Sequence, residues 1–248
     1  MMKITEAVKQ LLIINIIFYV GSVFVPATLD FLALYYFESP SFQFWQPLSH
    51  MFMHGGLMHL FFNMFALYSF GSALEHFWGS KKFIFFYLSC GLGAAALHTG
   101  VNYYLVHEGV SALVQNGFDK HEVMSILAEG KYIMQWKDIL GDSTFMNMVS
   151  AYNTPAVGAS GAIYGLLVAF AFMFPNAELA LMFIPVPVKA KYFVPAILGI
   201  DLYLGINGGS IFGGSTGVAH FAHLGGALMG YLMMWYWKKN QFKSNRWD

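Results

Sequence analysis

Six apolar stretches make up most of this chain, and each is long enough, or nearly so, to cross a lipid bilayer. The first runs for about twenty residues from the N-terminal region and carries no small-residue cleavage site, so we interpret it as a membrane span rather than a signal peptide. The other five occupy about 47 to 70, 82 to 106, 156 to 174, 191 to 207 and 216 to 237. We therefore expect an all-α polytopic membrane protein built as a six-transmembrane-helix bundle.

The composition excludes several other classes of protein. With 57% hydrophobic and only 10% charged residues, the chain is too apolar for an ordinary cytosolic enzyme. Its formal net charge of zero provides no basic field for nucleic acid, so the expected environment is the lipid bilayer. The single cysteine, Cys90, rules out an internal disulfide framework and is expected to be a packing residue of the third span.

The basic residues predict the orientation of the spans, because lysine and arginine collect in short cytoplasmic loops. Ten of the thirteen bases fall on one side of a six-span arrangement that has both termini in the cytoplasm. They lie before span one, after span two (Lys81 and Lys82), between spans four and five (Lys189 and Lys191), and in the C-terminal tail. The link between spans five and six, NGGSIFGGST, carries no charge and is expected outside.

Residues 107–153 form the one sizeable polar segment of the sequence. Part of it, FDKHEVMSILAEGKYIMQWKDIL, has apolar residues at helical spacing, which predicts one or two helices lying on the outer surface. We interpret the segment as a surface insertion between spans three and four of a single membrane domain, 1–248.

Polar residues within membrane spans are costly and are therefore candidates for function. They concentrate in three spans that all run from outside to inside in this topology: His50, His54, His59 and Asn63 in the second, Ser160 in GASGAIYG of the fourth, and His220 and His223 in AHFAHLGGALMG of the sixth. If the fourth helix begins near Ser160 and runs about fifteen residues, Ser160 lies several ångströms below the outer surface, at a depth similar to that of His223.

Small residues predict close packing between the fourth and sixth spans. Each carries a GxxxG motif, Gly161 with Gly165 and Gly226 with Gly230. Parallel packing through these faces would bring Ser160 and His223 together, so that a neutral imidazole could take the hydroxyl proton. His59 and Asn63, four residues apart on one helix face, can supply hydrogen-bond donors to a developing oxyanion, and Tyr164 can pack against the imidazole.

The patterns HxxxHGGxxHxxxN, GASGxxYG and AHxxGGxxxG, in this order on six spans, resemble the rhomboid intramembrane serine proteases over nearly the whole chain. The resemblance implies an endopeptidase that cleaves transmembrane or membrane-proximal segments of membrane proteins. It implies Ser160 as nucleophile, His223 as general base and acid, and His59 and Asn63 as oxyanion donors, with Tyr164, Gly158, Gly161 and Gly226 in support. Such proteases use a Ser-His dyad without an acid or a cofactor, and no acidic residue adjoins these motifs in the sequence.

The resemblance also implies a mobile lateral gate at the fifth span and a first loop at residues 31–46. The sequence departs from the family pattern in the insertion before span four and in FWQP of the first loop, where many members carry Trp-Arg. A six-span form with cytoplasmic termini suggests a prokaryotic inner or plasma membrane, with the active site open to the outer side.

Three other interpretations compete with this one. His50 and His54 could bind a metal, but HEVMS after Lys120 breaks the HExxH pattern and no carboxylate lies near them in sequence. A non-catalytic rhomboid-like protein that binds membrane clients would usually lack the nucleophile or the base. A transporter would show inverted repeats, and none is evident. His220 is expected to hydrogen-bond locally or to line the cavity, Glu75 to cap or pair with backbone groups, and Asp201 receives no role.

Overall fold

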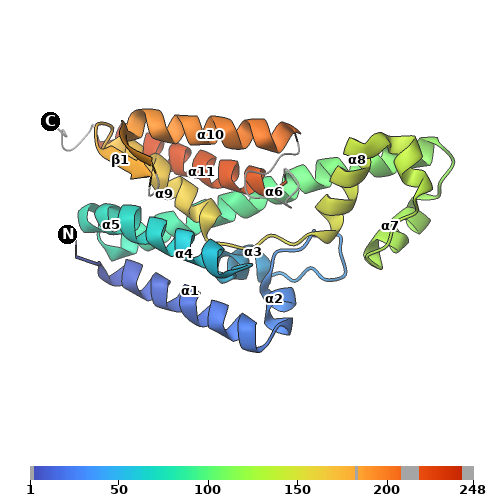
Figure 1. The fold of residues 1–248 in the computed structure, drawn as a ribbon, viewed down its shortest axis with the longest axis horizontal. Helices are drawn as coiled ribbons and strands as arrows, with labels where there is room; N and C mark the ends of the chain where they lie inside the picture. Colours follow the sequence, from blue (N-terminus) through green and yellow to red (C-terminus); the bar gives the residue numbers. More distant parts are fainter. Residues whose placement is uncertain (1–2, 182–183, 208–217, 242–248) are drawn as a thin grey trace.

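The structure, a computed structural model, describes residues 3–181, 184–207 and 218–241. Within these ranges the chain is almost entirely helical, which confirms the predicted all-α membrane fold (Figure 1). The helices are α1 (Glu6–Phe24), α2 (Ala27–Leu32), α3 (Gln46–Ser49), η1 (His50–Phe52), α4 (Leu57–Ala66), η2 (Leu67–Gly71), α5 (Ser72–Trp78), α6 (Ser80–Gln115), α7 (Lys120–Ala128), α8 (Gln135–Asn153), α9 (Ser160–Met173), α10 (Ala190–Asn207) and α11 (Val218–Gln241). The uncharged link expected between spans five and six lies largely outside the described residues.

Three helices in the described part of the chain are long and apolar enough to cross a membrane: Glu6–Phe24, Leu57–Trp78 and Ser80–Gln115. The second of these comprises α4, the π-helical turn η2 and α5 in unbroken succession. Helix α9 is apolar but shorter, with 14 residues. The count of six spans therefore stays a prediction. The fourth predicted span, α9, begins at Ser160, as the sequence analysis expected.

The boundaries predicted for the second span, 47 to 70, were wrong by several residues at each end. The structure divides the region into the short helices α3 and η1, an irregular segment, and a long helix that begins at Leu57. Gly56 precedes this helix in an extended conformation, so the chain turns between His54 and the helix that carries His59. The periodicity of apolar residues does not reveal this break, because the residues on both sides of it are apolar.

Helix α11 lies at the centre of the bundle, where it packs against α6, α9 and α10 (Figure 1). The core beneath these contacts contains aromatic and aliphatic side chains from α1, α5, α6 and α9, among them Val8, Leu74, Phe83, Tyr87 and Leu166. Many side chains on the outer sides of α1 and α4 are apolar and exposed, such as Ile17, Val23 and Phe61. A bundle that is apolar both inside and outside is suited to a lipid environment.

Glu75 and Lys82 lie close to the start of α1 and to the end of α11, respectively. Glu75 is buried and accepts hydrogen bonds from the backbone N–H groups of Ala7 and Val8, at 2.8 and 2.9 Å, and from the Ser80 hydroxyl, at 2.6 Å. The expectation that Glu75 caps backbone groups is confirmed. Lys82 lies 4.1 Å from the centroid of the Trp237 ring, a cation-aromatic pair typical of a membrane interface.

Helix α6 projects beyond the rest of the bundle, since its 36 residues make it about 54 Å long against about 30 Å of bilayer hydrocarbon. Helices α7 and α8 pack on the projecting end and share a core centred on Trp136, Leu127 and Met148 (Figure 1). The segment 107–153 is thus helical, as expected, but its helices pack on α6 as a separate cluster of side chains. Tyr36 from the first loop joins this cluster and donates to Glu38 at 2.6 Å.

A two-stranded antiparallel hairpin connects α9 to α10, and the sequence analysis did not anticipate it. Strand β1 (Glu178–Leu181) pairs with β2 (Ile184–Lys189). The two strands lie at the end of the bundle where α1 begins (Figure 1). Prolines at 185 and 187 exclude a helix there, although an extended chain tolerates them at the edge of a small sheet.

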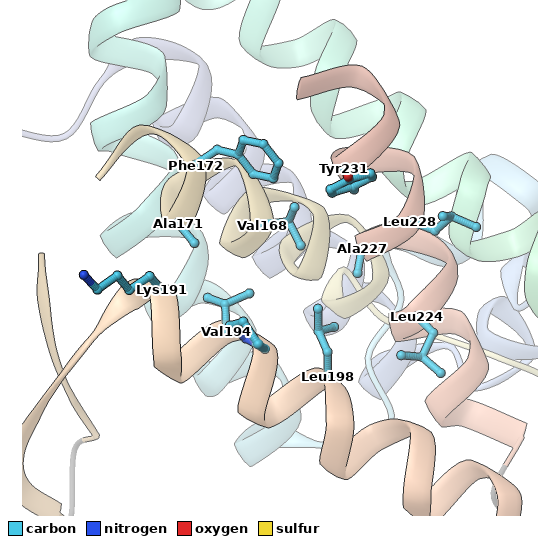
Figure 2. A pocket seen from close by; sticks show the side chains of 11 residues that line it. Val168, Ala171, Phe172, Lys191, Val194, Leu198, Leu224, Ala227, Leu228 and Tyr231 are labelled. Atoms are coloured by element: carbon cyan, nitrogen blue, oxygen red, sulfur yellow. The ribbon is translucent and has the colours of Figure 1, made fainter. Parts of the chain in front are cut away.

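An apolar groove of about 520 Å³ lies between α9, α10 and α11 (Figure 2). Its walls are formed by Val168, Phe172, Val194, Leu198, Leu224 and Tyr231, with Lys191 at one end. Neither Ser160 nor His223 lines this groove, so the groove is distinct from the cluster of polar residues described next.

Candidate active site

Ser160 is the first residue of α9, and two backbone contacts hold the loop that precedes it. The loop pairs with the first loop through Leu34 and Ala156, and the Gly158 N–H donates to the His50 carbonyl at 2.9 Å. Gly158 has φ +123°, a conformation that residues with a side chain rarely adopt. A Cβ at this position would lie 2.8 Å from the His59 ring, so glycine is also required for space.

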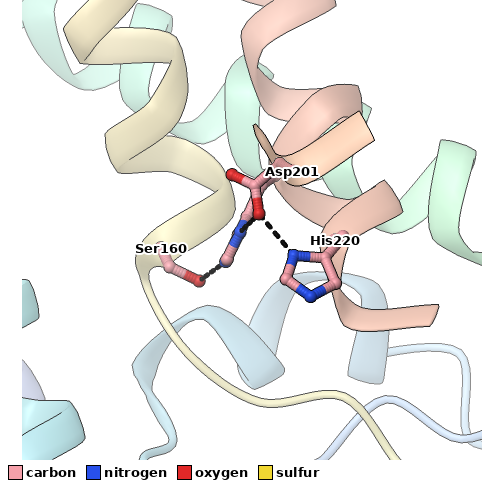
Figure 3. A network of polar contacts seen from close by, with 4 residues as sticks. Ser160, Asp201 and His220 are labelled. Carbon is pink, nitrogen blue, oxygen red and sulfur yellow. Dashed lines mark hydrogen bonds and ion pairs between the residues drawn. The ribbon is translucent and has the colours of Figure 1, made fainter. Parts of the chain in front are cut away.

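The hydroxyl of Ser160 and Nε2 of His223 are hydrogen-bonded at 2.9 Å (Figure 3). Helix α11 provides the imidazole, and the ring of Tyr164, one turn after Ser160, stacks on it with a centroid distance of 4.2 Å and an interplanar angle of 10°. The packing role expected for Tyr164 is therefore observed. Stacking restricts rotation of the imidazole, and the serine hydroxyl can donate to Nε2 when that nitrogen is the unprotonated one.

The two GxxxG motifs meet as the sequence predicted, and they set the distance between α9 and α11. A Cβ added to Gly226 would lie 1.8 Å from the carbonyl oxygen of Gly161. A Cβ added to Gly230 would lie 2.8 Å from the carbonyl oxygen of Gly165. The backbones thus approach more closely than any side chain would permit. This contact brings the Ser160 and His223 side chains within hydrogen-bonding distance.

The predicted oxyanion donors, His59 and Asn63, both belong to α4. An ideal Cβ on Gly158 would have His59 Nε2 at 2.8 Å and Ser160 Oγ at 3.6 Å, so both side chains border the same small space. Asn63 lies one turn further along α4, is 6% exposed, and its Nδ2 forms no hydrogen bond with any described residue. A buried amide donor of this kind is available to an acceptor that enters the site.

Asp201, to which the sequence analysis gave no role, lies beside His223. It lies on α10, is 5% exposed, and accepts hydrogen bonds at Oδ1 from Nδ1 of His223, at 3.3 Å, and from Nδ1 of His220 (Figure 3). No acidic residue adjoins the motifs in the sequence, but α10 brings a carboxylate 22 residues away in sequence beside His223. A lone acid in an apolar span was the available signal.

The remaining histidines differ in their surroundings. His220 contacts Asp201 on the neighbouring helix α10, a partner that the sequence analysis did not name. His50 donates from Nδ1 to the Gln46 carbonyl at 3.0 Å, within its own helical turn. His54 is 2% exposed and packs edge-on against the His59 ring at 5.1 Å between centroids.

One group in the described part of the chain could coordinate a cation, namely Asp201, His220 and His223, whose candidate ligand atoms lie within 4.8 Å of one another. The hydrogen bonds above already pair these atoms, with each imidazole donating to the carboxylate. We therefore assign the three side chains to a hydrogen-bonded network. His50 and His54, the pair considered from the sequence, do not belong to this group.

The fold and this site define a helical membrane protein in which a serine and a histidine from two closely packed helices meet. Residues 41–130 and 132–240 match the Rhomboid domain, and the chain belongs to the rhomboid family. An uncharacterized mitochondrial rhomboid protein of Schizosaccharomyces pombe is 30% identical over 164 residues, which cover 62% of this chain and 41% of that protein. Rhomboid protein 1, mitochondrial, of Saccharomyces cerevisiae is 27% identical, with 76% and 40% covered.

The presenilin-associated rhomboid-like protein, mitochondrial, of Bos taurus is 29% identical over 186 residues, covering 75% of this chain and 35% of that protein. The chain thus spans about two fifths of the length of these curated relatives. All three are named as mitochondrial, and they contradict the expectation of a prokaryotic inner or plasma membrane. The composition of the spans did not distinguish these membranes, because both require the same apolar helices.

Proposed function

We propose that this protein is an intramembrane serine endopeptidase that cleaves transmembrane or membrane-proximal segments of other membrane proteins. The observation that carries the proposal is the 2.9 Å hydrogen bond from Ser160 Oγ to His223 Nε2, beneath the stacked ring of Tyr164. A serine hydroxyl becomes an effective nucleophile when a correctly oriented imidazole accepts its proton. Membership of the rhomboid family supports the same class of reaction.

In the first step, Ser160 Oγ bonds to the carbonyl carbon of the scissile peptide while its proton passes to His223 Nε2. The carbonyl electron pair moves onto the oxygen and forms a tetrahedral oxyanion. When this intermediate collapses, the C–N bond breaks and Nε2 returns the proton to the leaving amine. Water then hydrolyses the acyl-enzyme by the same sequence of proton transfers.

The oxyanion would be stabilised by donors on the side of Ser160 that faces α4. The side chains of His59 and Asn63 and the backbone N–H of Ser160 are the proposed donors, since the first N–H groups of a helix lack partners within the helix. The buried Nδ2 of Asn63 can donate without first breaking a bond to the described residues.

The proposed partners are transmembrane helices that unwind readily and carry small residues near the cleavage point, because an extended peptide must reach Ser160. Neither a metal nor an organic cofactor is required by the proton transfers described. The names of the relatives direct the proposed location to a mitochondrial membrane.

The test is cleavage of a generic transmembrane reporter by the purified full chain, with Ser160→Ala and His223→Ala measured beside it. We expect wild-type cleavage to persist in a metal chelator and to be lost in both variants. Loss of cleavage on adding the chelator would refute the serine mechanism.

Labelling by a fluorophosphonate distinguishes the proposed protease from the remaining alternative, a rhomboid-like protein that binds clients without cleaving them. Such probes react with an activated serine, so we expect labelling of the wild type and none of Ser160→Ala. Absence of both cleavage and labelling in a folded wild-type protein would favour the client-binding function.

A further inference from the structure

A buried carboxylate completes the pair of Ser160 and His223 from a third helix. Asp201 Oδ1 lies 3.3 Å from Nδ1 of His223, on the side of the ring opposite the serine contact (Figure 3). The side chain is 7% exposed and lies among apolar helices, where an ionised group is costly. Two imidazole N–H groups donate to its oxygen, and such donors offset the cost of burial.

We propose that Asp201 is a positioning residue of this enzyme, which holds His223 in the tautomer and orientation that accept the Ser160 proton. The site would then be a Ser-His-Asp triad contributed by α9, α11 and α10. This inference rests on the proposed endopeptidase function and assigns a role to a residue that the dyad pattern leaves unused.

The chemistry requires a specific arrangement of protons on His223. Nε2 can receive the serine proton only if the ring carries its own proton on Nδ1, and a carboxylate facing Nδ1 selects that tautomer. The same carboxylate stabilises the positive charge that the ring acquires when Nε2 is protonated. Asp201 remains ionised throughout, and the Nδ1 proton stays on the ring.

His220 gives this arrangement a second hydrogen bond. It donates from Nδ1 to the same oxygen of Asp201 and lies one turn before His223 on α11. The contact fixes the carboxylate against α11 even when His223 changes its charge. Because Asp201 belongs to α10, the triad is complete only while α10 is docked against α11.

A purely structural role must be distinguished from this one, since Asp201 also links α10 to α11. We would therefore measure kcat and KM for reporter cleavage by the full chain in wild type, Asp201→Asn and His220→Gln, with thermal stability in detergent. Asp201→Asn keeps the size of the side chain but can donate to Nδ1 and so stabilise the wrong tautomer. His220→Gln weakens the link between the helices and leaves the contact of His223 with Asp201 in place.

We expect Asp201→Asn to lower kcat by about 100-fold, with KM nearly unchanged. This loss is smaller than the ~10⁴-fold loss found for the same substitution in a Ser-His-Asp triad, because Asp201 divides its hydrogen bonds between His223 and His220. His220→Gln should lose at most about tenfold. Fluorophosphonate labelling of Ser160 should slow in parallel with kcat. Equal kcat in wild type and Asp201→Asn would overturn the proposal, and so would equal losses in both variants accompanied by equal losses of thermal stability.

If Asp201→Asn does not fold, Asp201→Glu and Asp201→Gln provide a pair of equal size that differs in charge. We expect kcat of Asp201→Glu to exceed that of Asp201→Gln by about tenfold, because only the glutamate keeps the negative charge. Equal kcat values in the two variants would overturn the proposal. A folded wild type that neither cleaves nor labels would refute the proposed function itself, and the triad with it. Wild-type cleavage with an unaffected Asp201→Asn would refute the triad alone.

Discussion

The contact between α9 and α11 makes a sharp prediction for Gly226. A Cβ at this position would lie 1.8 Å from the carbonyl oxygen of Gly161, whereas ordinary contact begins at 3.4 Å. The obstructing atom belongs to the backbone of a helix, so it cannot rotate away as a side-chain tip could. In Gly226→Ala the two helices must separate by about 1.5 Å, unless the added methyl distorts one of them.

This displacement is large compared with the tolerance of the site. The Ser160 to His223 distance is 2.9 Å, and a further 1 Å takes the pair beyond hydrogen-bonding range. A misplacement of about 1 Å can reduce a catalytic rate about 100-fold. We therefore expect Gly226→Ala to lose at least that factor in kcat, together with about 1–3 kcal/mol or more of stability from overpacking.

Reporter cleavage and thermal unfolding in detergent measure the two effects, and Gly100→Ala is the matched control. Gly100 also lies within a helix, α6, but a Cβ there meets nothing within 4 Å. That variant should keep its activity and match or slightly exceed wild-type stability, because alanine is the better helix former. Wild-type activity and stability in Gly226→Ala would refute the argument that backbone contact positions the site.

Three further substitutions test separate parts of the structure. Glu75→Ala should lower stability by about 2–4 kcal/mol, because it leaves the N-terminal N–H groups of α1 without their buried acceptor, and thermal unfolding should show no such loss for exposed Glu6→Ala. Asn63→Ala should lower kcat by about 100- to 1000-fold through loss of an oxyanion donor, and an unchanged kcat would remove Asn63 from that role. Tyr164→Ala should lower kcat by about tenfold or more, whereas Tyr164→Phe, which keeps the ring stacked on His223, should lose much less.

Much of the fold followed from local sequence patterns. Apolar length predicted α1 and α6, and the glycine motifs predicted which faces of α9 and α11 meet, because a missing Cβ is a local property with a direct packing consequence. The structure also places Glu75 at the start of α1 and Lys82 beside Trp237 near the end of α11, in agreement with the distribution of bases along the chain.

The candidate site could be predicted in part for the same reason. Ser160 and His223 each lie in a recognisable pattern of small residues, and His59 and Asn63 share one face of a helix. The conformation of Gly158 and the break before Leu57 were not predictable in the same way, since both depend on what the chain meets in space: the His59 ring in one case and the loop around His50 in the other.

Sequence patterns alone were enough to predict apolar helices, two of them packed through glycines, and a serine and a histidine at matching depths. Only the tertiary structure placed Asp201 beside His223, packed α7 and α8 against the projecting end of α6, and formed the hairpin before α10. The physical reason is that an isolated acid has no periodicity or spacing to mark its partner. Its role is set by the direction in which α10 crosses α11, and that direction depends on side-chain packing between segments distant in the chain.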